Sequence, residues 1–143
     1  DCYLVKKGEN FIKTLRYYQG ENQLFFGQEI TDEVVAFVEA NKEIGQGVRV
    51  DNIIYETKIP YNTKAYLSES DLTMKRYYYC HCPWARESIR NGSFLVSPTF
   101  CQCSSGFHKR PYELLYKQPM KAEVLQSVLN GDPVCRFAIY LPL

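Results

Sequence analysis

The sequence predicts an α+β fold in which helices pack on one face of an antiparallel sheet and a β-hairpin closes the C-terminus. Apolar residues recur at helical spacing in the first third of the chain, and prolines mark helix starts in its middle. Two β-rich segments near the end are joined by Asn130-Gly131, a dipeptide typical of tight hairpins. With 143 residues, 45% of them hydrophobic, the chain is expected to form a single domain, 1–143, with its own core.

Two helices and a strand are predicted before residue 62. Apolar side chains over residues 11–18 fall on one face of a short helix. Thr31 is a suitable N-cap and two acidic residues follow it, so a second helix is predicted from there to about Gly45. The stretch 48–61 is rich in β-branched and aromatic residues and predicts a strand.

A strand and a short helix are predicted next. Residues 74–80 (MKRYYYC) have the composition of a strand and begin the cysteine-rich half, 74–143. Pro83 suits the first position of a helix, which makes Cys82 its N-cap residue. Asn91-Gly92 is expected to end this helix.

A longer helix and two strands complete the prediction. Ser97-Pro98 repeats the helix-start signal, and Pro111 is expected to break or kink the helix so that a separate segment runs over 111–116. The segments 120–129 and 134–141 are the two strands of the C-terminal hairpin.

Composition narrows the classes of partner. The net charge of +1 gives no reason to expect nucleic acid or an anionic membrane, and no apolar run reaches the roughly 20 residues that a bilayer span needs. No signal peptide opens the sequence. We therefore expect a cytoplasmic protein whose six cysteines are reduced thiols or metal ligands.

Cys82 has the strongest physical case for reactivity. A thiol at a helix N-terminus faces free backbone N–H groups and the positive end of the helix dipole. Both favour the thiolate, which is the form that attacks substrates and binds metals. The alternative is a small buried side chain before a Pro-Trp turn.

The two cysteines of the longer helix, two positions apart, point to nearly opposite sides. Cys103 belongs to an apolar stripe and is expected in the core. Cys101 lies on a polar stripe, with His108 one or two turns away; the other members of this stripe are Ser104, Ser105 and Tyr112. That stripe is either a solvated face or a site in which a thiol and an imidazole cooperate. The apolar stripe consists of Phe100, Cys103, Phe107 and Leu114.

Cys135 lies on the last strand, on the same face as Phe137. The expected hairpin register places it beside Val124, with Glu123 and Ser127 on the opposite face. Core packing is one interpretation of Cys135. The other is a composite metal site, because three thiolates and one imidazole nitrogen suit Zn²⁺. Its ligands would be Cys82, Cys101, Cys135 and His108.

The segments CHCPWARESI, PTFCQCSSGFHKRPYELL and NGDPVCRFAI resemble the 4-vinyl-reductase-type domain and, equally, the 2-amino-thiazoline-4-carboxylate hydrolase family. Both families share an α+β arrangement related to that of transport-particle (TRAPP-type) subunits. The resemblance covers about 60 residues, all in the C-terminal half. It implies a small-molecule-binding domain, in several relatives a sensory module that binds a hydrophobic ligand and often a cysteine-bound zinc ion. Cys135 would then be a zinc ligand.

Two classes of function follow. In the first, the chain is a binding or sensory domain whose cavity is walled by aromatic residues. In the second, it is a cysteine-dependent hydrolase of C–N or thiazoline ring bonds, with Cys82 or Cys101 as nucleophile and His108 as general base or acid. A homodimer is compatible with either. The proposed cavity walls are Tyr77, Tyr78, Tyr79, Trp84 and Phe107.

Overall fold

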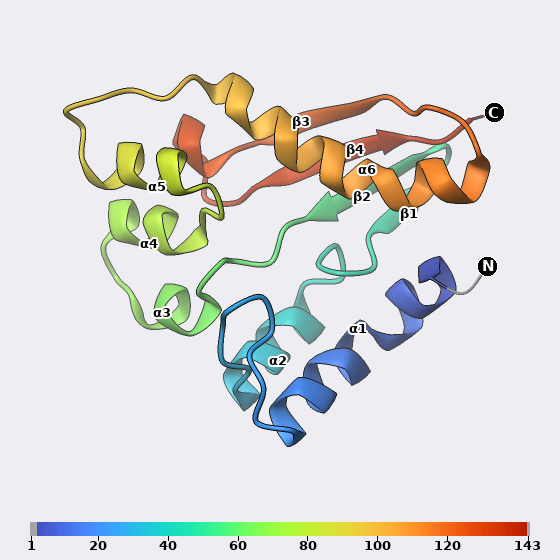
Figure 1. Cartoon of the computed structure of the whole chain (residues 1–143), viewed down its shortest axis with the longest axis horizontal. Coiled ribbons are helices and arrows are strands. Elements are labelled where there is room, and N and C mark those ends of the chain that lie inside the picture. The colour runs from blue at the N-terminus through green and yellow to red at the C-terminus, as the bar shows by residue number, and fades with distance from the viewer. Residues whose placement is uncertain (1–2, 143) are drawn as a thin grey trace.

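The computed structural model describes residues 3–142, with side chains described from residue 11 onward. Its elements are α1 (Tyr3–Gly20), α2 (Asp32–Ala40), β1 (Val48–Val50), β2 (Ile53–Thr57), α3 (Thr63–Ser68), α4 (Leu72–Tyr79), α5 (Pro83–Arg90), η1 (Pro98–Cys101), α6 (Gln102–Tyr116), β3 (Ala122–Gln126), η2 (Val128–Asn130) and β4 (Arg136–Tyr140). The strands form one antiparallel sheet in the order β1-β2-β4-β3. The predicted α+β class is confirmed (Figure 1).

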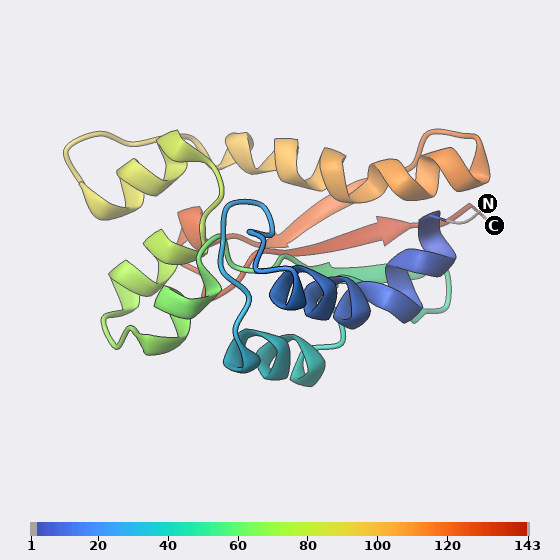
Figure 2. The same ribbon diagram turned by 60° about the horizontal axis from the view of Figure 1, so that its bottom comes forward.

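Helix α6 covers one face of the sheet, as Figure 2 shows along its upper side. Glu56 pairs with Phe137 across β2 and β4, so both side chains point to the same face. The Tyr112 hydroxyl of α6 donates a hydrogen bond to Glu56, which identifies this face as the covered one. On the other face the Arg136 guanidinium lies over the Tyr55 ring. No described helix is both long and apolar enough to cross a membrane.

Helices α1 and α2 bury an apolar cluster that includes Leu15 and Val34. The predicted N-cap of α2 is confirmed, because the Val34 backbone N–H donates to Thr31 Oγ1 over 3.3 Å. The helix ends at Ala40, earlier than predicted. Gly45 belongs to the loop that follows: its φ of +84° is left-handed, and a Cβ there would collide with the Phe11 ring.

The stretch 48–61 holds two strands rather than one. Val50 pairs with Ile53, so β1 and β2 form a tight hairpin whose turn contains Asp51 at a φ of +53°. Asp and Asn tolerate this left-handed conformation better than most residues, which explains why the turn falls at Asp51-Asn52. The β-rich composition marked the strands correctly, but it did not mark the reversal between them.

The predicted strand at 74–80 is wrong: these residues belong to helix α4 and its C-cap, Cys80. Asp71 supplies the helix start, since its Oδ1 accepts a hydrogen bond of 2.8 Å from the Met74 backbone N–H. The cap and the packing of Tyr79 into the core (1% exposed) outweigh the strand preference of three consecutive tyrosines.

Replacing Asp71 by Ala is expected to lower the free energy of unfolding by about 1 kcal/mol, because one helix N–H loses its acceptor. Urea denaturation followed by circular dichroism measures this change. Ser70→Ala, at the neighbouring exposed position, is the control and should leave the midpoint unchanged. Equal midpoints for the two variants would contradict the capping role.

Helix α5 begins at Pro83 with Cys82 as its N-cap residue, as predicted. The Cys82 side chain makes no capping hydrogen bond. Helix α6 runs through Pro111 without the expected break. The carbonyl that loses its partner to this proline is that of Phe107, whose side chain is 70% exposed, so water can take the place of the missing N–H.

The orientation of α6 is the reverse of the prediction. Ser105 and Tyr112 of the polar stripe are buried against the sheet, whereas Cys103 is exposed. The buried carboxylate of Glu56 explains the reversal, because it requires hydrogen-bond donors from the covering helix. Cys103, Phe107 and Leu114 of the apolar stripe therefore face outward, whereas the half-exposed Phe100 also lines a cavity at the end of the sheet.

The C-terminal strands pair antiparallel as predicted, but a nine-residue connection, 127–135, replaces the tight hairpin. It contains η2, and Gly131 ends η2 with a φ of +96°. The register also shifts between Val124 and Gln126. This irregularity turns Ser127 to the face opposite the one predicted, where its hydroxyl contacts Cys101.

Candidate functional site

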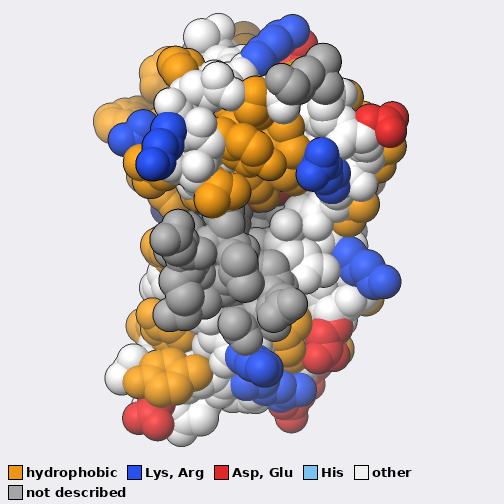
Figure 3. Space-filling model, turned by 90° about the vertical axis from the view of Figure 1, so that its right-hand side faces the viewer, with side chains coloured by type: hydrophobic (Ala, Val, Ile, Leu, Met, Phe, Trp, Pro, Cys, Tyr) orange, Lys and Arg blue, Asp and Glu red, His pale blue; other side chains and the backbone are white. Residues whose placement is uncertain are grey.

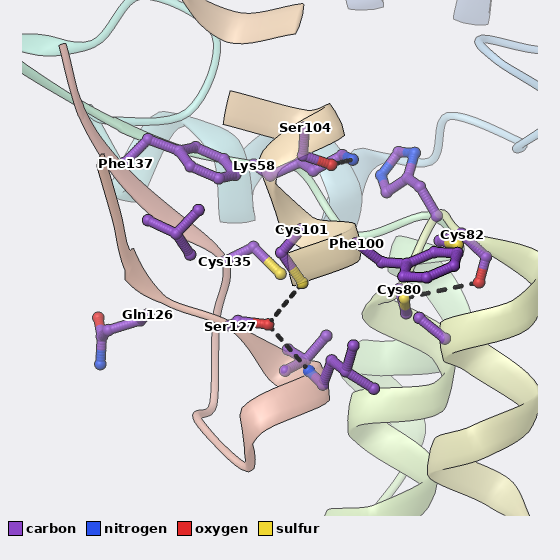
Figure 4. A pocket seen from close by; sticks show the side chains of 15 residues that line it. Lys58, Cys80, Cys82, Phe100, Cys101, Ser104, Gln126, Ser127, Cys135 and Phe137 are labelled. Carbon is purple, nitrogen blue, oxygen red and sulfur yellow. Dashed lines mark hydrogen bonds between the residues drawn. The ribbon is translucent and has the colours of Figure 1, made fainter. Parts of the chain in front are cut away.

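The candidate site is a small cavity of about 30 Å³ that lies between the α4–α5 junction, the start of α6 and the ends of β3 and β4 (Figure 4). Four cysteine side chains line it. Around them are two hydroxyls, a lysine, a histidine and apolar walls that include Phe100 and Phe137. A volume this small holds one or two water molecules or an ion, whereas sites for drug-sized molecules start near 300 Å³. The four cysteines are Cys80, Cys82, Cys101 and Cys135.

The connection between β3 and β4 positions one side of the cavity. Asp132 Oδ2 accepts a hydrogen bond of 2.8 Å from the Ser127 backbone N–H. The Ser127 hydroxyl in turn lies 2.9 Å from Cys101 Sγ, and it accepts from the Leu129 N–H. Gly131 permits the left-handed turn that brings Asp132 back to Ser127. The Gly-Asp pair thus fixes a polar contact for the Cys101 thiol.

The described cysteines are free thiols, and burial suppresses the ionisation of two of them. Burial raises the pKa of Cys80 to about 11 and that of Cys135 to about 12. Cys80 Sγ makes a weak contact of 3.7 Å with the Cys82 carbonyl. Both thiols are therefore neutral at pH 7, and a ligand that requires thiolates must displace their protons.

Lys58 places a largely buried ammonium group at this cavity. The Lys58 backbone makes two hydrogen bonds: its N–H donates to the Cys135 carbonyl over 2.9 Å, and its carbonyl accepts from the Tyr79 hydroxyl. The carbonyl of the next residue, Ile59, makes a hydrogen bond with His81. The Lys58 Nζ donates to Ser104 Oγ over 2.8 Å. Burial lowers the Lys58 pKa. No Asp or Glu is among the described residues that line the cavity, so no carboxylate there balances its charge.

His81 is the imidazole of the cavity wall. Its Nε2 lies 2.7 Å from the Ile59 carbonyl oxygen, which can only accept, so we assign the proton to Nε2 and the lone pair to Nδ1. Burial lowers the His81 pKa to about 4, and the nearby Lys58 charge adds to this effect. A neutral imidazole whose other nitrogen donates to a carbonyl is the form in which histidine binds metals.

Behind this cavity, Glu56 joins two residues of α6. Its carboxylate, 1% exposed, accepts hydrogen bonds of 2.5 Å from the Tyr112 hydroxyl and from His108 Nδ1. The bond to Glu56 raises the Tyr112 pKa in addition to the larger effect of burial. The His108 ring stacks on Phe137, with 4.8 Å between ring centroids. His108 is thus held in one orientation, with Nε2 left for other contacts.

The structure brings together three of the four metal ligands predicted from the sequence, Cys82, Cys101 and Cys135, on the wall of one cavity. His108 is not among the lining residues, and His81 and Cys80 line the cavity instead. The Cys80-His81-Cys82 run in the sequence is the signal that could have identified them.

The aromatic residues proposed as pocket walls do not line this cavity. Trp84 and Phe107 are 67% and 70% exposed, and Tyr78 contributes no lining atom either. The aromatic walls are those of Phe100 and Phe137. Tyr77 of α4 contacts Arg86 and Arg90 of α5 through its ring.

The side chains that line the cavity are of the types that bind zinc, but their positions in this structure do not form a zinc site. Thiols and a neutral imidazole are the donors that Zn²⁺ prefers. Among the described residues, however, no three His, Cys, Asp or Glu side chains stand together as a metal-binding group. A metal ion would have to draw the thiols inward from these positions.

A family model described as a family of unknown function, DUF6144, matches residues 23–142. No curated protein and no solved structure matches the chain. The matched span includes every residue that lines the cavity.

Proposed function

Because the chain belongs to the DUF6144 family, whose function is unknown, we propose from its own residues that it is a cytoplasmic binding domain of the sensory type, with a cysteine pocket that binds a zinc ion. The carrying observation is the convergence of four thiols from three separate parts of the chain on one cavity of about 30 Å³. Three of these cysteines, Cys80, Cys82 and Cys135, also pack in an apolar cluster, but four thiols on one small cavity form the donor set that zinc prefers. The resemblance of the C-terminal half to zinc-bearing sensory domains points in the same direction.

The charge of Lys58 supports an anionic occupant. A buried ammonium whose described partner is a neutral hydroxyl, Ser104, destabilises the fold unless a negative charge joins it. A zinc ion bound by three or four thiolates is a net anion. The proposed centre would therefore supply the charge that Lys58 needs. The nitrogen ligand in this proposal is His81 Nδ1, with Cys80, Cys82, Cys101 and Cys135 as the thiolate candidates.

Zinc titration of the reduced protein tests this proposal. We expect one zinc ion per chain by elemental analysis, and protection of the pocket thiols from alkylation until a chelator is added. Cys101→Ser and Cys135→Ser are each expected to weaken zinc binding at least tenfold. Cys103→Ser, at an exposed position outside the cavity, is the matched control and should bind like wild type. Absence of stoichiometric zinc, with all thiols alkylated equally with or without chelator, would rule out the metal site.

A cysteine-dependent hydrolase is the second candidate, favoured by the Glu56–His108 pair. A buried carboxylate that orients an imidazole is the arrangement that activates a nucleophile in hydrolases. The Cys101 thiol, however, contacts Ser127 rather than His108. This candidate predicts one thiol, of Cys82 or Cys101, that is alkylated far faster than the others near pH 7 in metal-free protein, and the loss of that fast phase in the corresponding Ser variant.

A further inference from the structure

The outward side of α6 and η1 carries a row of large apolar side chains in contact with solvent. Phe107 lies at its centre and is 70% exposed, Leu114 is 61% exposed and Phe100 is 51% exposed. Figure 2 shows α6 as the outermost element on its side of the sheet. Figure 3 views the end of the molecule at which α6 ends, and hydrophobic side chains also reach the surface there. Several large apolar side chains exposed along one side of a helix mark a candidate interaction surface.

The spacing of this row is symmetric about Phe107. Phe100 precedes it by seven residues, across the junction of the 3-10 segment η1 with α6, and Leu114 follows it by seven residues, two turns along α6. Cys103 fills the position one turn before Phe107, and Pro111 lies one turn after it. Two copies of the row, placed antiparallel, would therefore put Phe107 against Phe107 and each Phe100 against a Leu114.

The charges on α6 favour the same arrangement. No charged residue occurs from 91 to 107, whereas Lys109, Arg110 and Lys117 follow Phe107 and outnumber the one acidic residue, Glu113. A parallel pair of helices would bring the two basic halves together. An antiparallel pair places each basic half over the uncharged half of the other copy, so like charges stay apart.

We propose that a second copy of this chain covers this row, with α6 packed antiparallel on α6 about a two-fold axis at Phe107. Such an interface is isologous, so one self-complementary surface serves both copies. Exposed apolar side chains at the two ends of the row would extend the contact. They are Phe94 and Leu95 before α6, and Leu115 and Tyr116 at its end. Phe107 and Leu114 do not line the cysteine cavity, whereas Phe100 lines it and also reaches the surface, so one end of the interface lies beside the candidate site.

Sedimentation velocity over a range of concentrations tests the oligomeric state. We expect wild-type protein to sediment as a dimer at micromolar concentration, and Phe107→Asp to raise the dissociation constant of the dimer by about 100-fold or more. Because the Phe107 side chain is mostly exposed, the variant should retain the wild-type circular dichroism spectrum. Leu24→Asp, at a residue 62% exposed outside this row, is the control and should remain dimeric. A monomeric wild type, or a dimer insensitive to Phe107→Asp, would overturn the proposal.

Disulfide cross-linking tests the position of the axis. In a Cys103→Ser background, Phe107→Cys should form a covalent dimer under mild oxidation, because the two cysteines face each other across the axis. Native Cys103 should not cross-link, since it lies four residues from the axis and is displaced by about 12 Å along the helices from its symmetry mate. Leu24→Cys in the same background is the control and should stay monomeric on a non-reducing gel. Efficient cross-linking through Cys103 would contradict the proposed axis.

Discussion

Replacing Glu56 by Ala is expected to lower the free energy of unfolding by about 2–5 kcal/mol. The carboxylate is 1% exposed and accepts hydrogen bonds from Tyr112 and His108. Its removal takes one hydrogen-bond acceptor from each of these two donors, which lie between α6 and the sheet. Each lost hydrogen bond costs about 1–3 kcal/mol. The effect is larger than for an ordinary surface glutamate because water cannot replace the carboxylate there.

Glu123 provides a matched control for this prediction. It also accepts a hydrogen bond from a tyrosine, Tyr140, and contacts a cationic side chain, Lys121, but its side chain is 42% exposed. Urea denaturation of Glu56→Ala and Glu123→Ala should give a large shift in midpoint for the first and little for the second. Similar shifts would mean that burial of Glu56 contributes nothing to its role.

The location of Glu56 shows what the sequence could and could not predict. The composition of 48–61 correctly predicts β structure, and alternation places Glu56 on the same face as Ile54. The role of a charged residue on an apolar face cannot be predicted until its hydrogen-bond partners are known. Those partners lie 52 and 56 residues away, on a helix whose register depends on them.

The same dependence explains the reversed orientation of α6. Periodicity separates an apolar row from a polar one, but it does not tell which of them faces the sheet. The usual expectation, that the apolar row is buried, fails because Glu56 requires polar partners. The apolar row is then left for the contact with a second copy proposed above.

The candidate site was predicted in part. Helix-start signals and strand alternation singled out Cys82, Cys101 and Cys135, and all three line the cavity. The composition of residues 74–80 favours a strand and gives no reason to place Cys80 at the site, whereas in the structure Asp71 caps a helix that brings Cys80 there. Lys58 was missed because its role depends on tertiary contacts with Cys135 and Ser104, which no local pattern carries.

Replacing Lys58 by Met is expected to change two properties in opposite directions. In metal-free protein it should raise the free energy of unfolding by about 1 kcal/mol or more, because a largely buried charge is replaced by an apolar side chain of similar length. In the zinc-bound form it should weaken binding at least tenfold, because the proposed anionic centre loses its counter-charge. Few substitutions at a merely structural position both stabilise a fold and impair its ligand binding.

The pH dependence of the metal-free protein gives an independent check. Burial lowers the pKa of Lys58 in the folded state, so the unfolded chain binds the Lys58 proton more tightly than the folded chain does. The destabilisation is therefore fully present below the folded pKa and fades as the pH rises from there toward the ordinary lysine value of about 10.4. The stability advantage of Lys58→Met should shrink over that alkaline range.

Chemical denaturation of metal-free protein and competitive zinc titration measure the two effects of Lys58→Met separately. Lys64→Met is the control, because Lys64 is an exposed lysine paired with Glu29, and it should change neither quantity appreciably. Zinc affinity that stays at the wild-type value in Lys58→Met would show that the ammonium does not balance a metal centre. A stabilised variant with that affinity would leave Lys58 as a buried charge that serves some other anionic ligand of the cavity.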